Sequence, residues 1–79
     1  MKKLTTKDIL EVMADIKLYL EDFSGIDLNL PNGIAIGVSE MEGKFHLYLI
    51  DSDTGIPEDT IGTYDHVDEI GFQLAKMYM

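Results

Sequence analysis

The chain contains no cysteine, no arginine and no tryptophan among its 79 residues. Without cysteine it can form neither a disulfide nor a thiolate metal site, and this suits a reducing compartment. No apolar run approaches the roughly 20 residues that a membrane span needs. The two lysines near the start are followed by no apolar segment of the kind found in signal peptides. These absences predict a soluble, cytoplasmic protein that binds no membrane.

Basic residues are scarce, because six lysines stand against fifteen Asp and Glu and give a formal net charge of −9. Four of the six lysines lie within the first 17 residues. Binding to DNA or RNA depends on Lys and Arg side chains that neutralise phosphates, so we expect no direct nucleic-acid binding. An acidic surface instead attracts basic partners, or it serves only to keep a small protein soluble.

Residues that could carry catalysis or hold a cofactor are also few. His46 and His66 are twenty positions apart with no cysteine near them, which argues against a zinc site. Neither Ser24 nor Ser39 lies in a nucleophile elbow, and the chain has no glycine-rich phosphate loop. We therefore expect no enzyme activity, no cofactor and no metal.

One segment is similar to a calcium-binding loop but fails on its spacing. Asp51-x-Asp53-x-Gly55 begins like an EF-hand loop, which needs a ligand at position five, Gly at position six and Glu at position twelve. Here Gly55 stands at position five and Gly62 at position twelve. We interpret the segment as a polar loop rich in turn-forming residues.

An amphipathic helix is predicted before Ser24. Thr5 and Asp8 fit a capping box, or Thr6 caps the helix alone, and Ser24-Gly25 supplies a stop. Seven apolar residues recur at three- and four-residue steps, which predicts a stripe facing the core. They are Ile9, Val12, Met13, Ile16, Tyr19, Leu20 and Phe23.

A second row on this helix lies off the apolar stripe. Leu10, Ala14 and Leu18 are four residues apart on the opposite side, and acidic residues flank Leu18. A solvated face explains the row, since single exposed leucines are normal. The alternative is a small partner-binding or dimer surface, apolar in the middle with an acidic rim.

The segment 25–51 is predicted to form antiparallel strands, because its apolar residues alternate with polar or small ones. Residues 26–30 form the first strand, and Pro31-Asn32-Gly33 has the residue types of a turn. Residues 33–51 then read as a hairpin around which the fold is organised.

The register of that hairpin depends on its turn. A two-residue turn at Glu42-Gly43 pairs Val38 with Leu47 and Ile36 with Leu49, which gives one wholly apolar face. A three-residue turn that includes Met41 is also compatible, with glycine in the left-handed position. We prefer the first register, because a slip of one residue mixes the two faces.

The other face of the hairpin combines small residues with larger polar ones. In the preferred register Gly37 lies opposite Tyr48, Ser39 opposite His46, and Ile50 completes the face. These residues form either a shallow interaction platform or an ordinary, partly wet sheet face, which antiparallel sheets commonly have.

The chain is predicted to end with a strand at Thr60–Tyr64 and a helix for which Asp65 is the N-cap. An inward stripe is formed by Val67, Ile70, Leu74, Met77 and Tyr78. Beside it, Gly71 allows close packing. Phe72 and Met79 lie on the outward side, and an outward aromatic residue can anchor a partner.

The strongest local signal is an acidic run without Lys or Arg between His46 and Ala75. Helix capping and a solvated loop account for part of it. The remaining carboxylates could contact a basic protein or imitate nucleic-acid phosphates. The seven acids are Asp51, Asp53, Glu58, Asp59, Asp65, Asp68 and Glu69.

Together these patterns predict one α+β domain over residues 1–79: an N-terminal helix, a three- or four-stranded antiparallel meander and a C-terminal helix. Both helices are expected on the apolar face of the sheet, because two layers are the minimum that buries it.

For function, the sequence favours a small, non-enzymatic protein whose acidic surface docks a basic protein partner through those seven acids. Its specific form is an inhibitor of a nucleic-acid-binding protein, acting by nucleic-acid mimicry. In size and charge, though in no motif, the chain is similar to anti-restriction and anti-CRISPR inhibitors of phages and mobile elements. The alternative is a structural or oligomer-forming protein, such as a homodimer, that interacts through apolar residues and uses its charge only for solubility. The apolar candidates are Leu10, Leu18, Tyr48 and Phe72.

Overall fold

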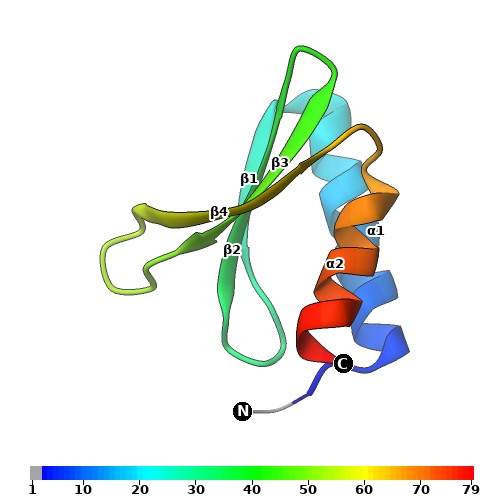
Figure 1. The fold of residues 1–79 in the computed structure, drawn as a ribbon, viewed down its shortest axis with the longest axis vertical. Helices are drawn as coiled ribbons and strands as arrows, with labels where there is room; N and C mark the ends of the chain where they lie inside the picture. Colours follow the sequence, from blue (N-terminus) through cyan, green and yellow to red (C-terminus); the bar gives the residue numbers. More distant parts are fainter. Residues whose placement is uncertain (1–2) are drawn as a thin grey trace.

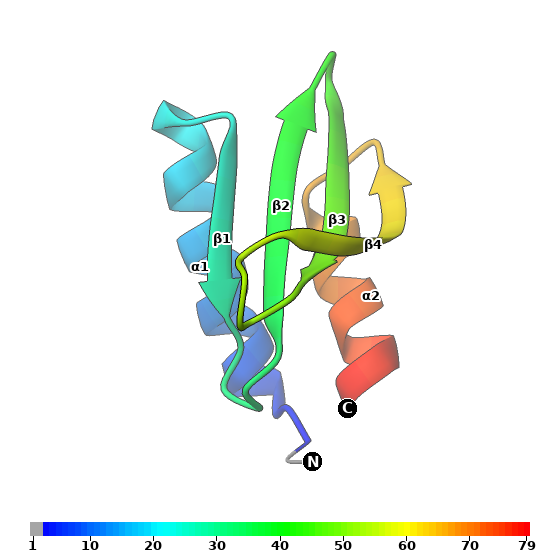
Figure 2. The ribbon, with the colours of Figure 1, turned by 90° about the vertical axis from the view of Figure 1, so that its left-hand side faces the viewer.

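The protein folds into two layers, with both helices on one face of a four-stranded antiparallel sheet (Figures 1 and 2). This computed structural model describes residues 3–79. The helices are α1 (Thr6–Asp22) and α2 (Asp68–Tyr78). The strands are β1 (Gly25–Asn29), β2 (Ala35–Met41), β3 (Lys44–Ile50) and β4 (Pro57–Tyr64). Their order in the sheet is β1-β2-β3-β4, a meander in which each strand pairs with its neighbour in the chain. The predicted α+β architecture is confirmed, with four strands.

Helix α1 begins at the predicted capping box. The Thr5 hydroxyl accepts a hydrogen bond from the Asp8 N–H at 3.1 Å, and the Asp8 carboxylate accepts one from the Thr5 N–H at 2.9 Å. These two bonds satisfy donors that the first turn of a helix leaves free. The predicted glycine stop is wrong, because the helix ends where Phe23 becomes extended (φ −128°, ψ 154°) and Gly25 already begins β1.

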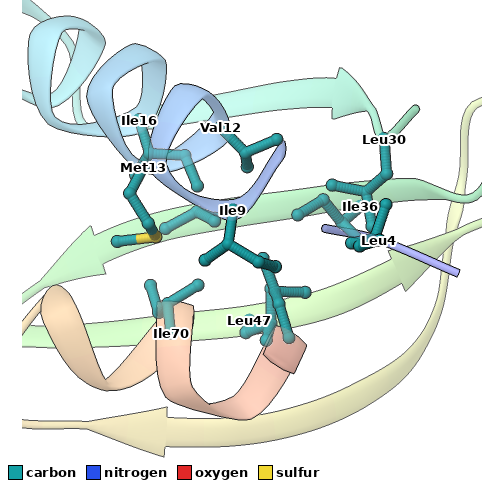
Figure 3. Packing of buried hydrophobic residues seen from close by; sticks show 11 residues of the cluster. Leu4, Ile9, Val12, Met13, Ile16, Leu30, Ile36, Leu47 and Ile70 are labelled. Carbon is teal, nitrogen blue, oxygen red and sulfur yellow. The ribbon is translucent and has the colours of Figure 1, made fainter. Parts of the chain in front are cut away.

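The hydrophobic core lies between the helices and the sheet (Figure 3). Its centre joins Ile16 of α1, Ile70 of α2 and Leu47 of β3, none of which retains measurable exposure. Where the two helices meet, a Cβ on Gly71 would lie 3.1 Å from Met13 Cγ, so the glycine allows the predicted close approach. The buried cluster comprises Leu4, Ile9, Val12, Met13, Ile16, Leu30, Ile36, Val38, Leu47, Ile70 and Leu74.

The hairpin has the preferred register. Val38 pairs with Leu47 and Ile36 with Leu49, so one face is apolar and lies against the helices. The turn contains two residues, Glu42 with φ 54° and Gly43 with φ 79°. Positive φ at both central positions is the type I′ turn, whose twist matches that of the flanking strands.

Strand β4 is longer than predicted, since it begins at Pro57 instead of Thr60. Two irregularities interrupt its register with β3. As an edge strand it can contain a proline and the charged residues Glu58 and Asp59, which are depleted in central strands. The low strand propensity of these three residues explains why the sequence pattern missed them.

Helix α2 is not capped by Asp65 as predicted. The helix begins at Asp68, and Val67 in the N-cap position makes no side-chain hydrogen bond. Instead, the Glu69 carboxylate accepts hydrogen bonds from the N–H groups of Asp65 and His66, both at 3.0 Å. The carboxylate of Asp65 is directed to a lysine on β3, so it is not available as the cap. Of the predicted inward stripe, Met77 is 38% exposed.

Candidate protein-binding surfaces

The seven acids of the C-terminal half fall into two groups at opposite ends of β4. The loop acids surround the β3–β4 connection: Asp51, Asp53, Glu58 and Asp59. The helix-start acids precede or begin α2: Asp65, Asp68 and Glu69. Residues 60–64 separate the two groups, which is roughly 17 Å of extended chain. The seven carboxylates therefore do not converge on one point.

Of the loop acids, Asp51 and Asp53 lie on a hydrogen-bonded turn, whereas Glu58 and Asp59 belong to β4. The Asp51 N–H donates to the Ile56 carbonyl at 2.9 Å, and the Gly55 N–H donates to the Asp51 carbonyl at 2.7 Å. The Asp51 carboxylate also accepts a hydrogen bond from the Asp53 N–H at 2.8 Å. Within residues 3–79, no lysine forms an ion pair with Asp53, Glu58 or the neighbouring Asp59. These three side chains are exposed and keep their charge available to a partner.

The helix-start acids are engaged within the chain. Asp65 pairs with Lys44 on β3, and Asp68 pairs with Lys17 on α1. The hydrogen bond from Lys44 and its positive charge lower the pKa of Asp65 below its ordinary value. Glu69 serves as the N-terminal acceptor described above. All three have structural roles, so a partner that uses them must compete with internal contacts.

The predicted apolar contacts lie on two different sides of the molecule. Leu10, Leu18 and Phe72 belong to the helix layer and are 66%, 63% and 73% exposed, so their predicted outward orientation is confirmed. Tyr48 lies on the opposite, uncovered sheet face, where it pairs with Gly37. The four side chains therefore form no single patch.

The uncovered sheet face carries the Tyr48 ring opposite the backbone of Gly37. A Cβ on Gly37 would lie only 2.2 Å from Tyr48 Cε2, which shows that the ring covers the glycine backbone. Burial, and to a lesser extent the negative charge of Asp27, raises the pKa of Tyr48. Beside it, His46 Nδ1 and the Thr63 hydroxyl are 3.0 Å apart. This face carries polar and small residues, as predicted, and its side chains contact one another.

A groove that was not predicted runs between the C-terminal half of α1 and β1. It has a volume of about 560 Å³. Tyr19 and Phe23 lie along it with their ring centroids 5.8 Å apart. Both were predicted to face the core, and that prediction is wrong, because they are 49% and 60% exposed. The groove is lined by Asp15, Tyr19, Phe23, Gly25, Ile26, Asp27 and Leu28.

The sequence did contain a signal for this groove. The apolar stripe of α1 has seven members, and only Ile9, Val12, Met13 and Ile16 are buried. The stripe continues for two more turns past the last buried residue. Its last aromatic residues therefore lie at the edge of the sheet. Because β1 is the edge strand on that side, Tyr19 and Phe23 have no further strand to cover.

Two kinds of arrangement are absent from the described residues: a cluster of metal-binding side chains and a helix that could cross a membrane. Within residues 3–79, no group of three or more His, Cys, Asp or Glu side chains is placed to hold a metal ion. In the same part of the chain, no helix is long and apolar enough to cross a membrane.

Comparisons with known proteins gave no relative from which a function could be transferred. No family model, no curated protein and no solved structure matches this chain.

Proposed function

We propose that this protein is a non-enzymatic binding protein that docks a basic protein partner through its acidic surface and thereby blocks or regulates it. The observation that supports this proposal is the state of the loop acids. Asp53, Glu58 and Asp59 are exposed and have no lysine partner within residues 3–79. Exposed negative charges without a lysine partner attract a basic surface. The cytoplasm, expected from the composition, is the compartment proposed for this interaction.

In its specific form, the partner is a nucleic-acid-binding protein and the carboxylates take the place of phosphates. The loop acids carry free negative charge at one end of β4. The helix-start acids at the other end offer a second contact to a protein that tracks a phosphate backbone, once their lysine partners are displaced. Double-stranded DNA should then displace the protein from its partner. A partner that binds DNA and this chain simultaneously would contradict mimicry while leaving the docking proposal intact.

The docking proposal is tested by charge reversal at the loop. The variant carries Asp53→Lys, Glu58→Lys and Asp59→Lys, which avoids the internally engaged Asp65 and Asp68. A matched control reverses three exposed acids of α1 and so has the same net charge: Glu11→Lys, Glu21→Lys and Asp22→Lys. Affinity capture from the native host's lysate should lose the basic partner with the loop variant and retain it with the control.

Two outcomes would contradict the proposal. Equal loss in both variants would show that net charge, and not the loop, attracts the partner. A partner that stays bound between about 0.05 and 0.5 M salt would also count against it, because salt screens exposed charge contacts.

A second candidate function is self-association through apolar side chains. It is favoured by the exposure of Leu10, Leu18 and Phe72 on the helix layer. Light scattering across a range of concentrations distinguishes the two functions, because a monomer at every concentration contradicts an oligomer. If dimers form, Leu18→Ser or Phe72→Ser should dissociate them, whereas the loop variant should not.

A further inference from the structure

We propose that the free edge of β1, together with the groove beside it, binds an extended basic segment of the partner as a fifth, antiparallel strand. This inference rests on the proposed function, because it takes the partner to be basic. It adds where and in what conformation the partner binds: at the β1 edge, with alternate side chains basic and apolar.

Strand β1 has unused hydrogen-bonding capacity along its outer edge. It pairs with β2 alone among the described strands. The Leu30 N–H donates to the Ile34 carbonyl at 2.8 Å, and the Ser24 carbonyl accepts from the Glu40 N–H at 2.7 Å. Because backbone groups in an antiparallel strand point alternately to its two sides, the even-numbered residues of this segment bond β2. The N–H and C=O groups of the odd-numbered residues, 25, 27 and 29, therefore point outward.

The other edge of the sheet is a poorer template. Strand β4 contains Pro57 and two register irregularities, as well as the charges of Glu58 and Asp59. Irregularities, proline and charges are the devices by which proteins protect an edge from strand addition. The pairing of β1 with β2 is regular over all five residues, from Gly25 to Asn29.

The groove supplies the apolar part of the site. Ile26 and Leu28 point to the helix side of the sheet and are partly exposed there. Tyr19 and Phe23 extend this apolar surface past the strand, because they line the same groove and are about half exposed. Aromatic side chains of this kind are enriched at binding hot spots. A strand added at β1 would direct every second side chain onto these four residues.

Charge selects the occupant. Asp15 lines the groove from α1, Asp27 lies on β1 at its edge, and none of the described lining residues is a lysine. A second copy of this chain is disfavoured, since antiparallel pairing of two β1 strands about their central residue would place Asp27 opposite Asp27, and like charges directly opposite are destabilising. With a net charge of −9, two copies also repel at longer range. Lysine or arginine on the partner strand would instead be attracted to Asp27 and to the net negative charge of this chain.

The partner segment should therefore alternate basic and apolar side chains. Asp27 pairs with Gly37 and belongs to the open sheet face, whereas Ile26 and Leu28 belong to the helix side. Basic side chains of the added strand lie on the open face beside Asp27, and apolar side chains lie in the groove. In an antiparallel pair, the residue opposite an outward-bonding position exchanges both hydrogen bonds with it. The backbone groups that bond β1 thus belong to the basic residues of the partner.

A peptide experiment tests this arrangement on the intact protein. The probe is a seven-residue peptide of alternating Lys and Val, blocked at both ends, and its control replaces each Lys with Glu. Two further peptides carry backbone N-methyl groups, either on the Lys residues or on the Val residues. Binding of the Lys–Val peptide should slow amide hydrogen exchange at positions 25, 27 and 29 at least tenfold. Methylation on Lys should weaken binding at least tenfold, and methylation on Val should change it less than threefold.

Two variants separate the backbone contact from the charge. Asp27→Asn keeps the outward N–H, so affinity for the Lys–Val peptide should fall only two- to fivefold. Asp27→Pro removes both charge and N–H without removing a bond to β2, and binding should be lost. If Asp27→Pro does not fold, the two methylated peptides answer the same question with the unaltered protein.

The outcomes distinguish this inference from the proposed function. Equal binding of both methylated peptides, or protection confined to residues 51–59, would overturn strand addition while basic docking at the loop stands. No binding of the Lys–Val peptide at millimolar concentration would overturn the inference, and the lysate capture with the loop variant would decide the function separately. Self-association of Asp27→Asn with protection at β1 would show a second copy as the occupant and would also overturn it.

Discussion

Replacing Gly37 with alanine should destabilise the protein only while Tyr48 is present. The backbone of Gly37 has no positive φ, so alanine itself is tolerated and should gain roughly 0.5–1 kcal/mol over glycine within a strand. Its Cβ would, however, lie 2.2 Å from Tyr48 Cε2, whereas non-bonded carbons settle at about 3.5–4.0 Å. The ring must therefore leave the position in which it covers the glycine.

The size of the destabilisation follows from the contact that the Tyr48 ring loses. If displacement exposes about 60 Å² of apolar surface, the loss is about 1.5 kcal/mol at 25 cal/mol per Å². Set against the gain from alanine, Gly37→Ala should destabilise the protein by roughly 0.5–1 kcal/mol. In a Tyr48→Ala background the same substitution should stabilise it by roughly 0.5–1 kcal/mol. The coupling energy between the two positions is then about 1.5 kcal/mol.

The assay is urea unfolding of the four proteins of this cycle, followed by far-UV circular dichroism because the chain has no tryptophan. Ser39→Ala, on the same strand and the same face, is the control and should show no coupling to Tyr48. Effects of Gly37→Ala that are equal in both backgrounds, within about 0.3–0.5 kcal/mol, would refute the reasoning, because the ring would then not cover the glycine.

A spectroscopic titration provides a second measurement of the same contact. Burial and the charge of Asp27 raise the pKa of Tyr48, so the neutral phenol contributes stability below pH 10. That contribution is lost as the pH rises through the pKa of the folded state. Gly37→Ala exposes the ring and should bring the pKa of Tyr48 back toward 10, which NMR titration of the ring resolves. An unchanged pKa would show that the ring has not moved.

Two further substitutions test other parts of the fold. Lys44→Met should raise the pKa of Asp65, which Lys44 now lowers. The difference in stability between wild type and variant should be present at pH 7 and disappear as the pH falls below about 4. A difference that persists at pH 2 would mean that Lys44 acts through packing instead. Gly71→Ala should change the free energy of unfolding by less than about 1 kcal/mol, because the flexible Met13 can yield to a Cβ 3.1 Å from its Cγ. Gly71→Leu should destabilise the protein by about 1–3 kcal/mol. Thermal unfolding measures both variants, and a Gly71→Leu variant as stable as wild type would show that the helices are not in close contact there.

The hairpin could be predicted from the sequence because two independent patterns agreed. The alternation of Ile36 and Val38 with small residues matched that of Leu47 and Leu49, and only one register places all four on one face. The turn residues alone favoured the other register. A non-glycine residue with positive φ is uncommon, and here Glu42 adopts it because burial of the apolar face on both strands outweighs that local preference.

The errors have a common physical origin, which is that local patterns do not show where a neighbouring element ends. Tyr19 and Phe23 continue the apolar period of α1 correctly, but the sheet stops at β1, so they line a groove. Asp65 is a good N-cap residue by type, yet Lys44 on β3 and Glu69 on α2 assign it another role. The first outcome depends on the order of the strands in the sheet, and the second depends on the pairing of Asp65 with Lys44 on a distant strand.

The candidate site, like the fold, could be predicted only in part. The sequence identified Asp53, Glu58 and Asp59, which are exposed and have no lysine partner within residues 3–79. An acidic run without lysine needs no tertiary information to be recognised. It could not show that Asp65 and Asp68 are paired with lysines of β3 and α1. Nor could it show that the outward groups of β1 adjoin the groove.

The hydrogen bond from the Leu4 N–H to the Tyr78 carbonyl, 2.9 Å long, has a practical consequence for binding assays. It holds the two described ends of the chain together beside the N-terminal end of α1 (Figure 1), while the groove lies along the C-terminal half of the same helix. A biotin or a sensor-surface tether attached after residue 79 would therefore emerge at the far end of a helix about 25 Å long. An immobilised protein would keep its β1 edge turned toward the solution, and the same attachment would serve for every variant considered above.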